Sequence, residues 1–196
     1  MKKTNFVRTF VSKDSYKEKE EREGVCIVHL DGALNEELGA YECVECSMPV
    51  SEYSEAAVNE AYAAWKTALT NRELARAKRE VLKKIEAYDT SSAVNGFILN
   101  GERVWLDFEL RDRVYQGNER LQRIGRTDTT LWLGKQCYNL SIEQAQNIIS
   151  HIEAYAKDCY NVTAAHKKAV SELATIEEVE KYDITAGYPA QLKMEV

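Results

Sequence analysis

The pattern of apolar and polar positions first predicts a strand-rich region at residues 1–50. Three runs there are β-branched or alternating: NFVRTFV, GVCIVHLDG and GAYECVECSMP. The charged segment KDSYKEKEEREG, which separates the first two runs, predicts a loop or a short helix. Two antiparallel strands with a longer connection fit the region best. Because fifty residues are too few for a hydrophobic core of their own, we expect them to pack on the following helix or on a partner.

A helical period replaces the strand pattern over residues 52–88. Its apolar stripe, which a polar gap divides, comprises Val58, Tyr62, Trp65, Leu69, Ala75, Leu82 and Ile85. Residues 70–73 (TNRE) have the spacing of a capping box, so the helix either restarts there or runs through. The pattern predicts a long helix that joins two modules, with a stripe that a second chain could cover.

The stretch GFILNGERVWLDFELRDR, residues 96–113, predicts a β-hairpin that leads directly into a helix. Asn100-Gly101 suits a type I′ turn, which needs positive φ at both central residues. This turn fixes a register in which Phe97 pairs with Val104, and Asp107 follows as the helix N-cap. The expected buried stripe of the helix, with Gly125 as its terminator, is Leu110, Val114, Gly117, Leu121 and Ile124.

The same design recurs about thirty residues later, in TTLWLGKQCYNLSIEQ. Gly134-Lys135 predicts a type II′ turn, and Ser141 with Gln144 predicts a capping box. The stripe of the helix that follows is Ala145, Ile148, Ile149, Ile152, Ala156, Cys159, Val162, His166, Val170 and Leu173. Thr175 and Glu178 mark the start of a short last helix. We expect the two hairpins to pair into one small antiparallel sheet under the two helices.

These patterns define the predicted fold class as α+β, with three regions. Residues 1–50 form a strand-rich attachment region, residues 51–88 a connecting helix, and residues 89–196 a hairpin-helix-hairpin-helix domain. Composition then restricts the partners. The formal net charge of −6 argues against nucleic acid, whose phosphates need clustered Lys and Arg. No apolar run approaches the roughly 20 residues of a membrane helix, so we expect no membrane partner.

The cysteines raise the question of a metal site. Five is an odd number, which favours reduced thiols over a complete disulfide framework. The motifs CIVH and CVEC give a candidate zinc set, Cys26, His29, Cys43 and Cys46. Both pairs lie in β-like runs, where residues i and i+3 point to opposite faces. Buried or half-buried thiols are therefore the preferred interpretation, and a small zinc-binding regulatory protein is kept as an alternative.

The sequence gives little support for a catalytic pair of a cysteine and a histidine. Cys137 or Cys159 could be combined with His151 or His166, but Cys159 and His166 are two helical turns apart, roughly 10 Å along the axis. His166 on an apolar stripe is better interpreted as a hydrogen-bonded packing residue. We therefore expect no enzyme activity and no cofactor. Trp65, Trp105 and Trp132 are the candidate interaction residues, since aromatic side chains are enriched in binding hot spots.

A series of short motifs at residues 86–189 carries a family resemblance: YDTSSAVNGFILNG, VWLD, TTLWLG, IEAYAKDCYNVTAAHKKAV and VEKYDITAGYP. In this order they resemble a domain of unknown function from phages and prophages of gut bacteria, found in tail-fibre and tail-fibre-assembly-like proteins. The matching residues are Asp89, Asn95, Gly96, Gly101, Trp105, Leu106, Asp107, Arg111, Trp132, Tyr155, Cys159, Asn161, His166, Asp183, Gly187, Tyr188 and Pro189. The resemblance implies a virion component or assembly factor, and it implies no catalytic residues.

These observations lead to an expected function. We expect a non-enzymatic phage virion structural protein, tail- or fibre-associated, that contacts other phage structural proteins. It would reside in the virion and, during assembly, in the bacterial host cytoplasm. The uncovered stripe through Trp65 favours a homo-oligomer, and a trimer would suit a fibre-like assembly. A tail-fibre assembly chaperone is the alternative.

Overall fold

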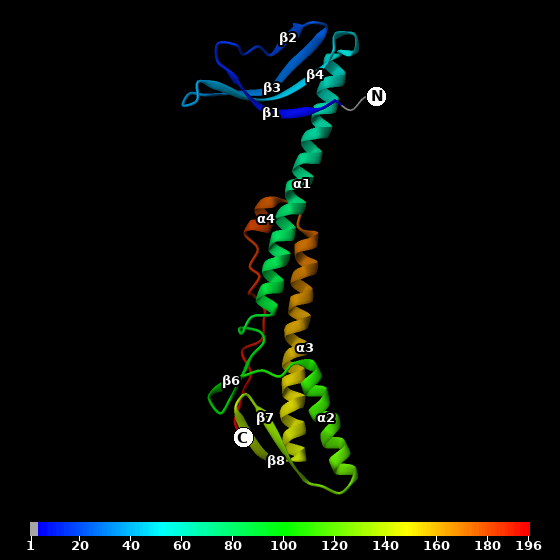
Figure 1. The fold of residues 1–196 in the computed structure, drawn as a ribbon, viewed down its shortest axis with the longest axis vertical. Helices are drawn as coiled ribbons and strands as arrows, with labels where there is room; N and C mark the ends of the chain where they lie inside the picture. Colours follow the sequence, from blue (N-terminus) through cyan, green and yellow to red (C-terminus); the bar gives the residue numbers. More distant parts are fainter. Residues whose placement is uncertain (1–3) are drawn as a thin grey trace. The chain divides into compact units, whose positions relative to one another are not determined.

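A computed structural model describes residues 4–196 and divides the chain into two compact units, Met1–Glu73 and Leu74–Val196. N-terminal strands are followed by the long helix α1 (Glu55–Asp89) and then by two β-hairpins, each with a helix after it (Figure 1). The predicted α+β fold class is confirmed. The capping-box spacing at residues 70–73 does not interrupt α1, which is continuous through it.

The first unit is built on a four-stranded antiparallel sheet. Its strands are β1 (Phe6–Ser12), β2 (Lys19–Arg22), β3 (Val25–Asn35) and β4 (Ala40–Pro49), in the order β1-β4-β3-β2, and the short helix η1 (Val50–Glu52) follows. The expectation of two strands with a loop or helix at KDSYKEKEEREG was wrong, because residues 19–22 pair with β3. Glu23 and Gly24 both have positive φ, which closes this hairpin tightly. A short charged strand suits the edge of a sheet.

The first part of α1 covers one face of this sheet. Cys26, Val28, Val44 and Cys46 point to that face and pack against Val58 and Tyr62. The part of residues 1–50 that the structure describes therefore packs on the helix that follows it, as predicted. The ring of Trp65 stacks on Tyr62 with 5.7 Å between the ring centroids. The chain's own sheet packs against Val58, Tyr62 and part of Trp65, so this part of the stripe no longer supports the expectation of an oligomer.

A β-bulge in β3 carries a polar cluster beside this core. The register of β3 on β4 shifts between Leu30 and Ala33, and Asp31 there has a φ of 52°. The Asp31 carboxylate accepts hydrogen bonds from the Tyr62 hydroxyl (2.9 Å) and the Lys66 ammonium (3.0 Å). Lys66 and Tyr62 hold the pKa of Asp31 below its usual value. Burial, and then the bond to Asp31, raise the pKa of Tyr62 to about 12.

The pKa of Tyr62 predicts how the stability of the first unit depends on alkaline pH. The folded unit keeps its proton on Tyr62 up to about pH 12, whereas an unfolded tyrosine loses it near pH 10. This group's contribution is therefore complete below pH 10 and is lost as the pH rises from 10 to 12, by about 2 kcal/mol. Urea unfolding at each pH, followed by Trp65 emission in a chain with Trp105→Phe and Trp132→Phe, measures this loss.

Tyr62→Phe is expected to abolish that part of the pH dependence. Its free energy of unfolding should be lower by about 1 kcal/mol at pH 7, because the bond to Asp31 is lost. Tyr160→Phe is the matched control, since it removes an exposed hydroxyl from the second unit. If the free energy of unfolding falls with pH equally steeply in Tyr62→Phe and in the parent chain between pH 10 and 12, Tyr62 is not the cause of the pH dependence.

The second unit contains the rest of α1 and every later element. In chain order these are β5 (Phe97–Leu99), β6 (Glu102–Val104), α2 (Phe108–Arg123), β7 (Asp128–Leu133), β8 (Gln136–Ser141), α3 (Ile142–Glu172), α4 (Ile176–Glu180) and β9 (Lys193–Met194). Both hairpin registers are confirmed, including Phe97 opposite Val104. Asn100 and Gly101 have φ of 48° and 84°, as a type I′ turn requires, and Gly134 has 60°, as a type II′ turn requires.

The two hairpins do not form one sheet, contrary to our expectation. β5 lies between β6 and β9, and it pairs with β9 in parallel, whereas β7 and β8 form a separate two-stranded ribbon. Both hairpins nevertheless share one core with α3, in which Phe97, Leu99, Leu131 and Leu133 pack on Ile152 and its neighbours. The edge of β5 that we had expected to pair with the second hairpin pairs with β9 instead.

The predicted helix ends are correct, but some buried faces are rotated. Asp107, Ser141 and Thr175 are N-caps, the latter two in capping boxes, and Gly125 ends α2 with a φ of 83°. In α2, the predicted core residues Leu110 and Ile124 are exposed, whereas Arg111 and Asn118 are buried. In α1, Ala75 is exposed and Val81 is buried. In α3, Tyr155 and Thr163 are more deeply buried than the predicted Ala156 and Val162. The bonds of Arg111 to the Leu106 carbonyl and the Glu153 carboxylate account for the rotated face of α2, whereas the buried amide nitrogen of Asn118 has no hydrogen-bond partner within residues 4–196.

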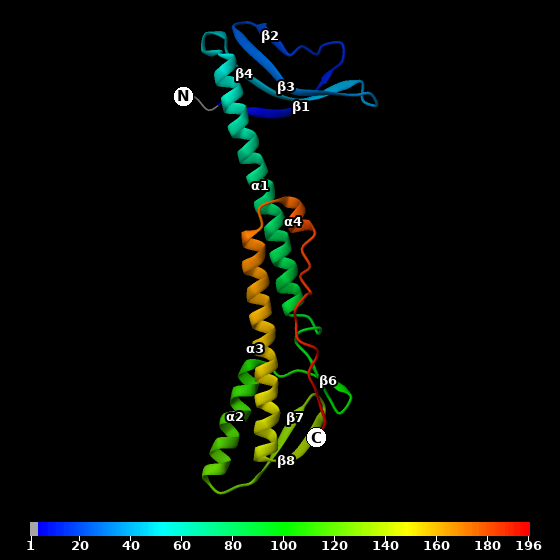
Figure 2. The same cartoon turned by 180° about the vertical axis from the view of Figure 1, so that it is seen from behind.

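Residues 181–192, here named the C-terminal segment, are held to α3 by buried polar side chains. The two ring nitrogens of His166 each lie 2.8 Å from an oxygen of this segment, the Tyr182 hydroxyl and the Ala186 carbonyl. Thr163 donates to Asp89 and also contacts the Tyr188 hydroxyl, both at 2.7 Å. The prediction that His166 is a hydrogen-bonded packing residue is confirmed. The C-terminal segment leads to β9 (Figure 2).

None of the helices formed by residues 4–196 combines the length and apolar character needed to cross a membrane.

Candidate protein interaction site

A groove of about 390 Å³ lies between α2 and α3. One helical stripe of each helix forms a wall. The lining residues are Phe108, Arg111, Asp112 and Tyr115 from α2, and Ile149, Ser150, Glu153, Ala154 and Lys157 from α3. The spacing i, i+3, i+4, i+7 on α2 places its four side chains on one face. Two parallel walls at helical spacing are the geometry into which a third helix packs.

Arg111 is the structural centre of the groove. Its guanidinium is buried and donates to the Leu106 carbonyl at 2.6 Å and to the Glu153 carboxylate at 2.7 Å. It also lies 5.4 Å from the centre of the Trp105 ring. Asp107 caps the same helix by accepting a hydrogen bond from the Leu110 backbone N–H. The start of α2 is therefore fixed by the two Arg111 hydrogen bonds and by the Asp107 cap.

Aromatic side chains at the groove remain exposed to solvent. Phe108 is 65% exposed and Tyr115 40% exposed. Opposite them, the small residues Ser150 and Ala154 allow close approach to the backbone of α3. Large exposed apolar side chains beside a shallow channel are characteristic of protein interaction sites rather than of a solvated face. An amphipathic helix with one apolar anchor would bury Phe108 and Tyr115 together.

The three tryptophans predicted as interaction residues lie in different environments. Trp65 is half-buried in the first unit, in contact with Phe6 and Tyr62. Trp105 is half-buried in the second unit and packs on its core. Trp132 is 65% exposed on the β7–β8 ribbon. Packing within the chain accounts for Trp65 and Trp105, and only Trp132 of the three presents its ring freely to a partner.

The candidate zinc residues are divided between the two faces of the first sheet. Cys26 and Cys46 lie on the face that α1 covers, within the core. His29 and Cys43 are each three residues away from them along β3 and β4, an odd number, so they point to the opposite face, here called the outer face. Burial raises the pKa of the Cys43 and Cys46 thiols. The four side chains do not converge on one point, and over residues 4–196 no group of three or more His, Cys, Asp and Glu could hold a metal ion.

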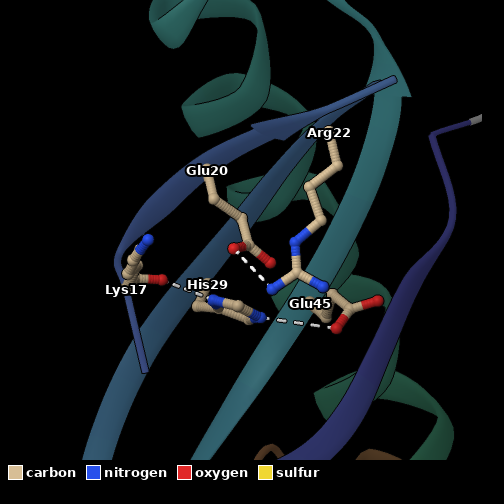
Figure 3. Close-up of polar contacts among 5 residues, drawn as sticks. All are labelled: Lys17, Glu20, Arg22, His29 and Glu45. Atoms are coloured by element: carbon tan, nitrogen blue, oxygen red, sulfur yellow. Dashed lines mark hydrogen bonds and ion pairs between the residues drawn. The ribbon is translucent and has the colours of Figure 1, made fainter. Parts of the chain in front are cut away.

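The outer face carries a small polar cluster around His29 (Figure 3). The Nδ1 of His29 faces the Lys17 carbonyl, and its Nε2 lies 3.4 Å from the Glu45 carboxylate. Arg22 donates to Glu20 at 2.9 Å on the neighbouring strand. These contacts engage both nitrogens of the buried His29 ring. The cluster ties the Lys17 segment to the sheet.

The candidate cysteine and histidine pairs are also separated by their contacts. Burial raises the pKa of the Cys159 thiol. His166 is held by the C-terminal segment. His151 is exposed, with its Nδ1 2.8 Å from the Asn147 carbonyl one turn earlier in α3. Neither histidine therefore contacts a candidate cysteine through its ring nitrogens, and Cys137 is exposed on β8.

Comparisons with protein-family models, with curated proteins and with solved structures gave no match for this chain. The resemblance of residues 86–189 to a phage domain therefore stays a prediction from the motifs.

The groove itself was not predicted from the sequence. Asp107 was predicted only as the helix N-cap, and Leu110 was placed on the buried stripe instead of Arg111. A signal was present: Phe108 follows the cap directly, and Tyr115 lies seven residues later, on the same helical face. Two aromatic residues at this spacing outside the predicted core stripe indicate a second apolar face.

Proposed function

We propose that this chain is a non-enzymatic structural protein of a phage particle, associated with the tail or its fibres. In this proposal the second unit binds another phage structural protein through the α2–α3 groove. The observation that carries it is the pair of solvent-exposed rings, Phe108 and Tyr115, on a helix whose start is fixed by buried Arg111. A rigid wall with exposed aromatic anchors loses little conformational entropy on binding.

The partner that fits the groove is an amphipathic helix with one large apolar residue. Asp112 on one wall and Lys157 on the other offer charges of both signs at the rim, which would fix the direction of such a helix. The motifs of residues 86–189 support a phage context, because they resemble a domain of tail-fibre and tail-fibre-assembly-like proteins. The protein would then be found in the virion, and in the bacterial host cytoplasm during assembly.

Mass spectrometry of purified particles tests the proposal against its alternative. A structural protein should be present at a constant ratio to the other tail proteins. Absence from particles, together with co-purification with a fibre protein from infected cells, would identify an assembly chaperone that uses the same groove. Absence from both preparations would overturn both functions.

Charge introduced into the groove should block incorporation into particles. We expect Phe108→Glu combined with Tyr115→Glu to reduce the amount of this protein per particle by about tenfold or more, because burying the carboxylates against apolar partner side chains is costly. The double variant should remain folded, since both side chains are exposed at 40% or more. Quantitative mass spectrometry of particles measures the effect.

Ile124→Glu is the matched control for this prediction. Ile124 is 75% exposed at the end of the same helix and does not line the groove. Its substitution adds one carboxylate to the same helix outside the groove and should leave incorporation at the wild-type level. Equal incorporation of the groove variant and the control would place the contact elsewhere on the chain.

A further inference from the structure

The two edges of the first sheet differ in a way that suggests self-association. β2 forms one edge with four residues, KEER, all of them charged. β1 forms the other with seven residues, FVRTFVS, and contains neither proline nor a bulge. Val7 and Phe10 on it are 52% and 58% exposed. Edge strands are normally protected by shortness, charge or distortion. Within residues 4–196 β2 has such protection and β1 has little of it beyond Arg8.

The backbone of β1 offers unpaired groups at alternate residues. The N–H of Lys13 donates to the Gly39 carbonyl at 3.0 Å and so continues the β1–β4 ladder. Hydrogen-bonded and non-hydrogen-bonded pairs alternate in an antiparallel ladder. Val7, Thr9 and Val11 therefore bond to β4, whereas Arg8 and Phe10 direct their N–H and C=O groups away from it. An added strand would pair through these groups.

The side chains of β1 are symmetric about Thr9. Val7 and Val11 lie on either side of it on the outer face, and Arg8 and Phe10 do so on the face toward α1. In an antiparallel pair centred on Thr9, each Val7 meets a Val11, and each Arg8 meets a Phe10, a favourable cation–π contact. Centring on Arg8 would instead oppose two guanidinium groups. In the register centred on Thr9, the sequence of the strand thus complements itself.

We propose that a second copy of this chain binds at the edge of β1 and joins two first units into one continuous antiparallel sheet about a two-fold axis through Thr9. The two central hydrogen-bonded pairs of the junction are Arg8 with the partner copy's Phe10 and the reciprocal pair. The interface is two-fold, so it builds a dimer and not a trimer. It goes beyond the proposed function, because it needs only the first unit and no phage partner.

A charge-swap pair of variants tests the register. Phe10→Lys places an ammonium group opposite the Arg8 guanidinium twice across the axis, and should raise the dimer dissociation constant by about tenfold or more. Adding Arg8→Glu restores two opposite-charge pairs and should recover dimerisation. Leu38→Lys, at an exposed position between β3 and β4, should behave as wild type. Light scattering after gel filtration at about 50 µM, with the 22.3 kDa chain mass as reference, measures each state.

Cross-linking provides a second measurement that does not depend on affinity. In a background with Cys43→Ala, which removes the thiol opposite Thr9 on β4, and Cys137→Ser, Thr9→Cys places two thiols opposite each other at a non-hydrogen-bonded pair, where the Cα distance of about 4.5 Å permits a disulfide. Oxidation should give a covalent dimer. Val7→Cys should not, because each Val7 faces a Val11 in this register. A monomeric or trimeric wild-type chain, a fully dimeric Phe10→Lys variant, or cross-linking through residue 7 rather than 9 would each overturn the proposal. None of these outcomes would affect the particle experiment.

Discussion

Arg111→Met is expected to lower the free energy of unfolding of the second unit by about 3 kcal/mol. Methionine retains most of the apolar stem but donates no hydrogen bond. The Leu106 carbonyl then loses a buried donor at 2.6 Å, and the Glu153 carboxylate loses its partner at 2.7 Å. Urea unfolding followed by circular dichroism measures the loss, and the emission of Trp105 reports the change next to the guanidinium.

Two controls separate the bond to Leu106 from the bond to Glu153. Glu153→Gln keeps an acceptor in place, and the Glu153 side chain is 48% exposed, so we expect a loss of about 0.5 kcal/mol. Arg113→Met removes an exposed arginine from the same helix and should have almost no effect. A loss for Arg111→Met no larger than that for Arg113→Met would mean that the buried contacts of Arg111 do not stabilise the start of α2.

His166→Phe is the second change with a large expected effect, about 2–3 kcal/mol. Phenylalanine fills a similar volume but leaves the Tyr182 hydroxyl and the Ala186 carbonyl without their partner on α3. The C-terminal segment should detach more often, and β9 should detach with it. Hydrogen exchange is the sensitive measurement, because the amides of Ile98 and Asn100 donate to Leu192 and Met194. Both amides should exchange faster.

Tyr182→Phe removes one of the two His166 contacts and is the graded control, with an expected loss of about 1 kcal/mol. The amides of Thr129 and Leu131 on the separate β7–β8 ribbon should keep their protection in both variants if detachment is local. Unchanged exchange at Ile98 and Asn100 in His166→Phe would show that the histidine does not hold the C-terminal segment.

The features predicted correctly from sequence are those set by residues close together in the chain. The turns at Asn100-Gly101 and Gly134-Lys135 fixed both hairpin registers, because φ requirements act within four residues. The caps at Asp107, Ser141 and Thr175 act within one helical turn. Each of these signals is local, so a single sequence contains all the information it needs.

The features that sequence reasoning missed depend on distant partners. β2 was missed because its four charged residues have no strand pattern, and pairing with β3 decides its conformation. The rotated face of α2 depends on the Leu106 carbonyl and on Glu153, which lies 42 residues from Arg111. The spacing of apolar residues cannot predict that a guanidinium is buried. The groove was missed with it, since the same rotation exposes Phe108 and Tyr115.

The parallel pairing of β9 with β5 has a consequence for how the second unit is made. Asn100 exchanges two amide hydrogen bonds with Val196, across 96 positions of the chain. During synthesis the β5–β6 hairpin therefore leaves the ribosome long before β9, the third strand of its sheet, has been made. During that interval the edge of β5 that pairs with β9 remains unpaired and can pair with other chains. A chaperone or a neighbouring nascent chain that occupied this flank would compete directly with completion of the fold.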